Sequence, residues 1–264
     1  MGFLRITDND LKLFRYLLEQ DFLSREQIKN YVWKDLNNSH IDNRLARLTK
    51  LNYIKKHPDM SGTFTTVVMA DKMAKALLGN NTIVERMINL ENYFINNKDF
   101  INAYDTRDQP VLARFNHDEY LTNIRLKLEK KVSEYLSYRL LQVHNKNNTD
   151  DKYTGPTPDS LAIIKGKTIA IELENTLKRK IKYEKEIFSG YNEDDRVDYV
   201  FYFCTERNIY EKIIKYVADF FKKREVNTEI LAIDYEKLMR HNTIMAVRKD
   251  TIGENKKRLK LDLK

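Results

Sequence analysis

Residues 159–174 read DSLAIIKGKTIAIELE, and this stretch determines how the second half of the chain folds. Two apolar, β-branched segments, SLAII and TIAIELE, flank the residues KGK. β-Branched side chains favour strands, and a short connection that contains glycine is typical of a β-hairpin. The sequence therefore predicts two adjacent antiparallel strands with a tight turn at Gly166.

Helices and strands alternate around this hairpin. The expected elements are, in chain order, a long helix over 117–136, a strand over 138–144, the two hairpin strands, a helix over 175–191 capped by Asn175 or Thr176, a strand over 197–204, a helix over 208–224, a strand over 228–234 and a short helix over 235–240. This α-β-β-β-α-β-α-β order predicts an α/β domain over residues 117–240, in which helices flank a central mixed sheet.

The hairpin also carries the acidic residues of chemical interest. Side chains alternate between the faces of a strand, so Glu172 and Glu174 share one face, and hairpin pairing brings Asp159 near Glu172. Carboxylates are the ligands that Mg²⁺ prefers, and the bound ion can activate water for phosphodiester cleavage. Asp159, Glu172 and Glu174 are therefore candidate catalytic residues, with Asp159 and Glu172 as metal ligands. The alternative is an ordinary solvated hairpin edge, with Asp159 as a turn residue.

The first half of the chain begins with a run of helical patterns. Residues 8–20 place apolar residues on one helical face, behind an acidic start that Asp8 or Asp10 caps. After a short turn, Ser24 and Gln27 form the capping-box signature of a second short helix.

A third helix and a hairpin follow. Residues 39–51 have helical spacing, and residues 53–57 and 63–70 read as strands on either side of the turn residues PDMSG. Three helices followed by a hairpin are the order of a winged helix-turn-helix domain, which we expect over residues 1–80. Such a domain places its third helix in the DNA major groove.

The third helix separates apolar from polar residues. Ile41, Leu45 and Leu48 share one stripe, and the DNA-contacting candidates on the helix and the hairpin are His40, Asn43, Arg44, Arg47, Lys50, Lys55 and Lys56. His40, Asn43, Arg47 and Lys50 are expected to provide specificity, and Lys55 and Lys56 to hold phosphates. Two alternatives are a merely solvated basic face and a protein–protein contact, which the winged fold also makes.

The two remaining segments receive separate interpretations. Residues 81–116 are expected to be a helical connector, and the apolar stripe that enters it from residue 71 indicates core packing or a homodimer contact. Residues 241–264 are expected to be a basic C-terminal tail, because residues 248–264 hold seven bases and three acids. This tail is either a flexible arm that adds DNA affinity or a short helix with a solvated basic face.

The hairpin acids resemble the core motif of the PD-(D/E)xK nucleases. Pro158-Asp159, then Glu172-Leu173-Glu174 after a hairpin, match the family pattern, and the α-β-β-β-α-β order is similar. The resemblance implies that Asp159 and Glu172 bind Mg²⁺. Glu174, however, occupies the position of the lysine that positions water in that family, although Lys165, Lys167 and Lys178 are nearby. The resemblance therefore implies either a deoxyribonuclease with a relocated lysine or a nuclease-like fold without catalysis, which requires no cofactor.

Most of the chain resembles the replication-relaxation family. The resemblance rests on the N-terminal winged helix, a helix that begins His117-Asp118 and contains Asn123, the strand IAIELENT and a Lys-rich helix that ends in Tyr191. This family, from plasmids and integrative conjugative elements of Gram-positive bacteria, includes mobilisation accessory proteins that help a relaxase act at a transfer origin. Its pattern is closer to ELDRGTE, and here Glu174 replaces the Asp and the Arg-Gly pair is missing.

Composition limits the remaining possibilities. The chain has 264 residues, with 47 Lys and Arg against 39 Asp and Glu, which gives a net charge of +8 and favours a polyanionic partner. One cysteine is incompatible with a disulfide framework or a Cys-cluster zinc site, and no glycine-rich phosphate loop occurs. With no signal-peptide pattern and no long apolar run, we expect a cytoplasmic protein without a membrane partner.

These observations lead to three functional hypotheses. The first is a DNA-binding accessory protein of plasmid or conjugative-element mobilisation, which binds the transfer origin and recruits or positions a relaxase. The second is a metal-dependent endonuclease or nickase that uses Asp159, Glu172 and Glu174. The third is a transcription or replication regulator that binds its own promoter.

Overall fold

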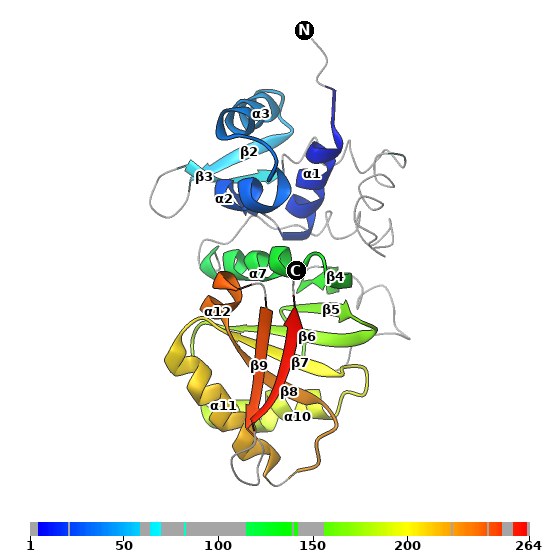
Figure 1. Ribbon diagram of the computed structural model, residues 1–264, viewed down its shortest axis with the longest axis vertical. Coiled ribbons are helices and arrows are strands. Elements are labelled where there is room, and N and C mark those ends of the chain that lie inside the picture. Colours follow the sequence, from blue (N-terminus) through cyan, green and yellow to red (C-terminus); the bar gives the residue numbers. More distant parts are fainter. Residues whose placement is uncertain are drawn as a thin grey trace. The chain divides into compact units, whose positions relative to one another are not determined.

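The computed structural model describes residues 5–20, 22–58, 64–69, 82, 115–138, 140–141, 156–222, 224–241, 243–249 and 256–262. Contacts divide the chain into two compact units, Met1–Thr122 and Asn123–Lys264. The described residues form an α+β protein, in which helices come first and a mixed sheet with interleaved helices follows (Figure 1). The expected connector over 81–116 lies almost entirely outside the described residues.

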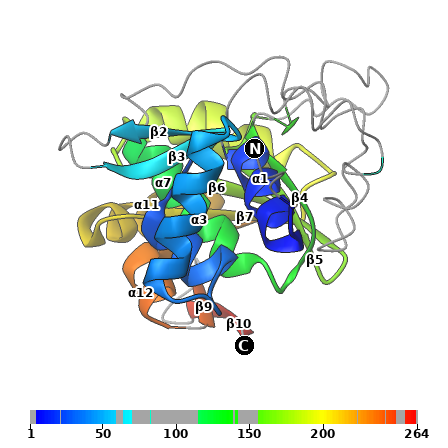
Figure 2. The same cartoon turned by 90° about the horizontal axis from the view of Figure 1, so that it is seen from above.

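The first unit has the predicted order of helices and hairpin. Its elements are α1 (Asp8–Gln20), β1 (Phe22–Ser24), α2 (Arg25–Gln27), the π-helix η1 (Ile28–Val32), α3 (Asn38–Lys50), β2 (Ile54–Pro58) and β3 (Phe64–Met69). The strands form an antiparallel sheet in the order β1-β3-β2, and α3 packs beside β2 (Figure 2). The short turn expected at Phe22 and Leu23 is instead strand β1, because these residues pair with β3.

The N-terminal caps are partly as predicted. The capping box of α2 is confirmed, since Gln27 N donates to Ser24 Oγ (3.1 Å) and Ser24 N donates to Gln27 Oε1 (2.8 Å). The expectation that Asp8 or Asp10 caps α1 is wrong. Thr7 takes this position, because Asp10 N donates to Thr7 Oγ1 and Thr7 N donates back to the Asp10 carboxylate.

Local signals also fix the ends of α3. Asn37 caps its first turn, where its Oδ1 accepts a hydrogen bond from His40 N (2.9 Å). At the other end Asn52 adopts a left-handed conformation with φ of 58°, and Tyr53 N donates to Leu48 O (2.9 Å). This is the hydrogen bond of a Schellman stop, and it turns the chain directly into β2.

The second unit is built on a seven-stranded sheet. Its elements are α7 (Phe115–Leu128), which begins in the first unit, β4 (Val132–Ser137), β5 (Ser160–Ile164), β6 (Lys167–Glu174), α9 (Lys180–Lys182), the π-helix η3 (Tyr183–Ile187), α10 (Phe188–Asn192), β7 (Tyr199–Cys204), α11 (Arg207–Phe221), β8 (Glu229–Asp234), α12 (Tyr235–Arg240), β9 (Thr243–Lys249) and β10 (Lys256–Asp262). The sheet order is β10-β9-β8-β7-β6-β5-β4. Strands β6, β7 and β8 are parallel, and the other neighbours are antiparallel.

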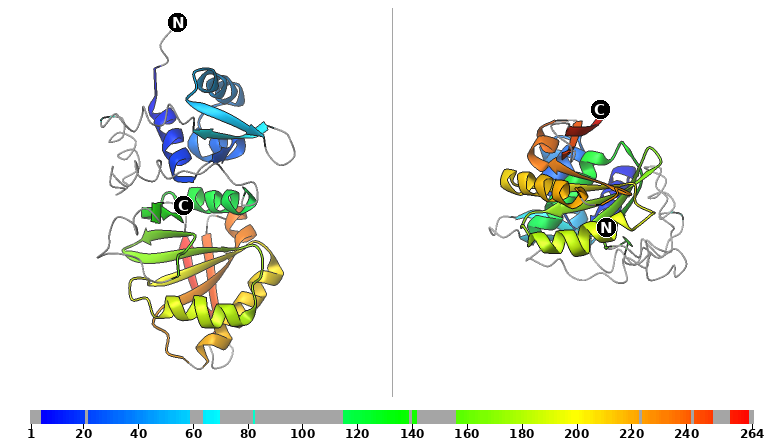
Figure 3. Two further views of the ribbon diagram at one scale, coloured as in Figure 1. Left: turned by 180° about the vertical axis from the view of Figure 1, so that it is seen from behind. Right: turned by 90° about the horizontal axis from the view of Figure 1, so that it is seen from below.

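Helices α10 and α11 cover one face of this sheet (Figure 3). Phe188 and Tyr191 of α10 and Ile213 of α11 are fully buried against Val200 and Tyr202 of β7. The hairpin β5–β6 and its turn at Gly166 are confirmed, and Gly166 has a φ of 72° that suits glycine.

Three expected elements of the second unit are wrong. The helix expected over 117–136 ends at Leu128, and residues 132–137 form β4, because they pair with β5. Of the strand expected over 138–144, the described residues 138, 140 and 141 are helical, and the other residues lie outside the described part of the chain. The next helix begins at Lys180 after Arg179, so neither Asn175 nor Thr176 caps it.

The C-terminal segment is also ordered differently from the expectation. Instead of a flexible arm or a short helix, residues 243–249 and 256–262 form an antiparallel pair, β9 and β10, which extends the sheet beyond β8. A basic composition is compatible with a disordered tail and with a strand. Here the segment forms strands, because β9 pairs with β8 and β10 pairs with β9.

Candidate functional site

The outer face of α3 carries the first candidate site. His40, Asn43, Arg47 and Lys50 are all exposed. Their spacing places them within an arc of about 80° on the helix, opposite the apolar stripe. Ile41, Leu45 and Leu48 of that stripe are buried, as the sequence predicts. The helix therefore presents two hydrogen-bonding side chains and two bases on one accessible face.

The neighbouring strand β2 carries two exposed lysines, Lys55 and Lys56, whose side chains point to opposite faces of the strand. The acidic residue of α3, Asp42, is paired inside the unit, since Arg25 donates two hydrogen bonds to its carboxylate (2.7 and 2.9 Å). This pairing lowers the pKa of Asp42 below its ordinary value, and the charge of Lys56 acts in the same direction. Arg25 thus neutralises the charge of Asp42, the acidic residue of α3.

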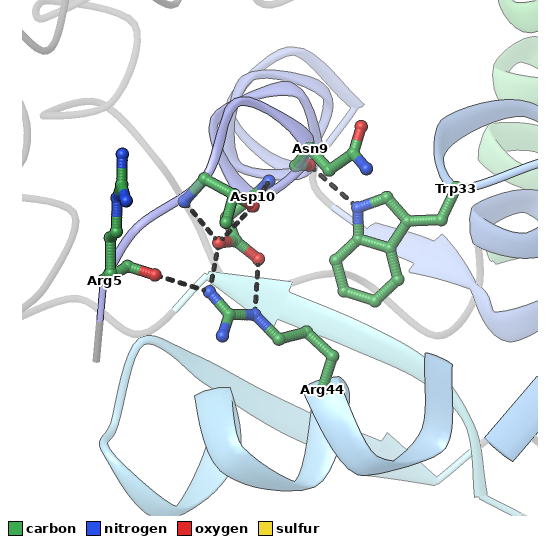
Figure 4. A network of polar contacts seen from close by, with 6 residues as sticks. Arg5, Asn9, Asp10, Trp33 and Arg44 are labelled. Atoms are coloured by element: carbon green, nitrogen blue, oxygen red, sulfur yellow. Dashed lines mark hydrogen bonds and ion pairs between the residues drawn. The ribbon is translucent and has the colours of Figure 1, made fainter. Parts of the chain in front are cut away.

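Arg44, a predicted DNA contact, is held by a network on the flank of α3 (Figure 4). Its guanidinium donates to both carboxylate oxygens of Asp10 and to Arg5 O, and Asp10 is only 1% exposed. Trp33 Nε1 donates to Asn9 O (2.8 Å) beside it. Arg44 therefore connects α3 to the first turn of α1, and sequence spacing did not reveal this partner.

The carboxylates of the second unit gather at the end of β6, as the hairpin predicts. The last pair of β5 with β6 is Ser160 with Ile171, and Asp159 Oδ2 accepts a hydrogen bond from Leu173 N (2.8 Å). Burial and the nearby charge of Asp159 raise the pKa of Glu172 to about 8, and a hydrogen bond from Tyr191 opposes this shift. Glu172 therefore retains its proton to a higher pH than an ordinary glutamate does.

Two tyrosines from the covering helix bind these carboxylates. Tyr191 Oη donates to Glu172 Oε1, and Tyr183 Oη donates to Glu174 Oε2 (2.6 Å). In a regular α-helix, eight residues would leave these tyrosines about 80° apart. The wide turn of η3 takes up about one residue, so both side chains face β6. Sequence reasoning missed them, because an eight-residue spacing does not place two side chains on one face of a regular α-helix.

Glu174 has a second partner. Lys178 Nζ donates to the same oxygen, Oε2, at 2.8 Å, and Glu174 is only 2% exposed. Of the three lysines near the motif, Lys178 is the one that reaches the carboxylates. Lys167 pairs instead with Asp198 (2.7 Å), and Lys165 lies exposed in the turn of the hairpin.

Tyr202 lies beside Glu172 in the register of β6 and β7, and it is 1% exposed. Its hydroxyl has no hydrogen-bond partner among the described residues. Burial, with the charges of Glu172 and Glu174, raises the pKa of this phenol well above its ordinary value, so it is a neutral hydroxyl.

The carboxylates at the end of β6 are turned toward different partners. Within the described part of the chain, no group of three or more His, Cys, Asp or Glu residues is placed to hold a metal ion. Glu174 is turned to Lys178 and Tyr183, which leaves Asp159 and Glu172 as the two carboxylates that the nuclease resemblance assigns to Mg²⁺. What the arrangement does chemically is to fasten the helix that contains η3 to the end of β6.

Comparisons with known proteins identify no relative: no family model, no curated protein and no solved structure matches this chain. In the residues that the structure describes, no helix is both long enough and apolar enough to cross a membrane.

Glu172 predicts a specific pH dependence of stability. The folded state holds its proton up to a pH of about 8, whereas the unfolded chain releases it near the ordinary value of 4.5. Stability therefore falls as the pH rises between these values, by at most about 1.4 kcal/mol per pH unit. Glu172→Gln keeps a neutral hydrogen-bond acceptor and is expected to remove this part of the slope. Urea unfolding in EDTA at several pH values measures it.

The matched control is Glu186→Gln, which changes an exposed glutamate of η3. An equal pH slope in the wild type and in Glu172→Gln contradicts the assignment of the proton to Glu172.

Proposed function

We propose that this protein binds duplex DNA through its first unit, with α3 in the major groove. The observation that carries the proposal is the outer face of α3, where His40, Asn43, Arg47 and Lys50 are exposed together opposite a buried stripe. Three helical segments followed by the β2–β3 hairpin are also the order of a winged helix-turn-helix domain, whose third helix reads DNA.

The side chains divide between base and phosphate contacts. Asn43 and Arg47 have the donors and acceptors that recognise base edges, and His40 and Lys50 lie on the same arc. Lys55 and Lys56 on β2 suit the phosphates that flank the groove. Arg44 is not assigned to DNA, because its guanidinium already binds Asp10 and Arg5 O.

The second unit suits a nuclease-like scaffold that positions a partner without cutting DNA. Its β4-β5-β6-β7 order with Asp159 and Glu172 at the end of β6 supports the PD-(D/E)xK resemblance. Against cleavage stands Glu174, which is bound by Lys178 and Tyr183. With the resemblance to mobilisation accessory proteins, we propose that the protein binds a transfer origin in the cytoplasm and recruits a relaxase.

The phosphate contacts predict a change in salt dependence. Lys55→Gln combined with Lys56→Gln is expected to weaken binding to all duplexes alike and to lower the slope of log affinity against log salt by about two, because each phosphate contact contributes about 0.9. Fluorescence anisotropy at several salt concentrations measures this slope. The control is Lys212→Gln with Lys215→Gln on α11, which removes two exposed lysines of the second unit. Equal slopes for both variants contradict the assignment.

Arg44 and Asp10 are expected to act as positioning residues for α3. Arg44→Gln or Asp10→Asn should lower affinity for the specific duplex about tenfold or more, because the base-reading side chains shift, while the salt slope is unchanged. The double variant should be no weaker than either single variant, since both remove one interaction. Near-UV circular dichroism checks the fold. A slope that falls by about 0.9 in Arg44→Gln, but not in Asp10→Asn, identifies Arg44 as a phosphate contact instead.

Incubation with supercoiled plasmid that carries the transfer region of the encoding element separates the accessory role from cleavage. With Mg²⁺ or Mn²⁺ we expect a site-specific gel shift and no nicking. Metal-dependent nicking that is absent in EDTA and in Glu172→Ala identifies a nuclease. A shift of the protein's own promoter, and not of the transfer region, identifies a regulator.

A further inference from the structure

A basic segment follows β6 in the second unit. It reads KRKIKYEK over residues 178–185 and holds five bases and one acid. The structure fixes its backbone at two points. Tyr183 Oη donates to the buried Glu174 carboxylate and also accepts a hydrogen bond from Lys178 N (3.1 Å), and Lys180 Nζ pairs with Asp219 of α11 (2.6 Å). These contacts connect the segment to β6 and to α11.

Three of its bases lack an acidic partner in the described structure. Arg179, Lys182 and Lys185 are exposed, and no described carboxylate lies within 4.0 Å of their charged groups. By contrast, Lys178 and Lys180 are both in salt bridges. Lys178 and Lys180 thus attach the segment to the rest of the second unit. The other three bases place positive charge on its exposed side.

An apolar residue, Ile181, lies between Arg179 and Lys182 in the sequence. Ile181 is 57% exposed, more than Leu51 (43%) and Tyr138 (38%), the other large exposed hydrophobics of the described residues. Tyr183, Phe188 and Tyr191 occupy the inner side of the same helical stretch. An exposed isoleucine lacks the favourable free energy of burying its apolar surface. A ligand that has negative charge outside and apolar groups inside can bury this side chain while it binds the neighbouring bases.

We propose that this segment is a second DNA-contacting surface, in which Arg179, Lys182 and Lys185 bind phosphates and Ile181 wedges between base pairs in the minor groove. Phosphates lie on both sides of the stacked bases in DNA, and bases in this segment precede and follow one exposed apolar residue in the sequence. Proteins that bend DNA insert isoleucine between base pairs of the minor groove. An anionic membrane fits less well, because interfacial helices need a broad apolar face. The inference rests on the proposed function only in that DNA is the ligand of both surfaces.

The phosphate part is tested with a matched pair of variants of the full chain. Arg179→Gln with Lys182→Gln removes two exposed bases three residues apart, and Lys212→Gln with Lys215→Gln removes two exposed bases with the same spacing on α11. On a random-sequence duplex, the first variant is expected to lower the salt slope by about two, whereas the second leaves it unchanged. Equal slopes in both variants, whether lowered or unchanged, overturn the proposal.

The wedge is tested with Ile181→Ser, and Ile181→Leu is the control that keeps an apolar side chain. A duplex with 2-aminopurine reports unstacking as increased fluorescence. We expect the wild type and Ile181→Leu to give this increase and Ile181→Ser to lose it without a change in salt slope. An equal signal from Ile181→Ser overturns the wedge. Loss of binding to phosphatidylserine vesicles in Arg179→Gln with Lys182→Gln, with DNA binding intact, assigns the surface to membranes and overturns the proposal.

The two proposals fail in different ways. If Lys55→Gln with Lys56→Gln leaves the salt slope unchanged while Arg179→Gln with Lys182→Gln lowers it, the α3 interface is wrong and this surface stands. The reverse result overturns this surface alone. A wild-type chain that binds no duplex overturns both.

Discussion

The buried carboxylate of Glu174 is the constraint on which most of the second unit depends. A carboxylate that is 2% exposed needs compensating charge and hydrogen bonds, and here Lys178 and Tyr183 supply them. Because both partners come from the chain just after β6, this interaction determines where the covering helix starts and how it is rotated. The wide turn of η3 then brings Tyr191 over Glu172 as well.

The same interaction bears on chemistry. A nuclease of the type that the motif resembles keeps its carboxylates available to a metal and its lysine available to water. Here the lysine and the third carboxylate neutralise each other, and Glu172 holds a proton under a tyrosine hydroxyl. The acids therefore connect the helix that contains η3 to the end of β6. The hydroxyl of Tyr202 next to them has no described partner.

Periodic patterns were the reliable part of the sequence. The buried stripe of α3, the capping box of Ser24 and Gln27, and the β5–β6 hairpin each depend on residues a few positions apart, and all three are confirmed. What failed depends on distant partners. The spacing of Val132 and Tyr135 is compatible with a helix or with a strand, and only their pairing with β5 makes this segment a strand. Arg44 likewise binds a residue that lies 34 positions away in the sequence. The tyrosines opposite Glu172 and Glu174 needed the geometry of η3, which no local pattern signals.

A net charge of +8 does not by itself locate a polyanion, because only bases that are not already paired release counterions when DNA binds. Arg25, Lys178 and Lys180 are used within the fold. Arg47 and Lys50 on α3, and Arg179 and Lys182 after β6, are exposed without a described acidic partner. The internal salt bridges thus hold the two basic segments, α3 and residues 178–185, in place. The exposed bases of these segments are then available to a ligand. This difference between paired and unpaired bases is the physical reason why our proposals place DNA contact at these two surfaces and do not rest on the overall charge.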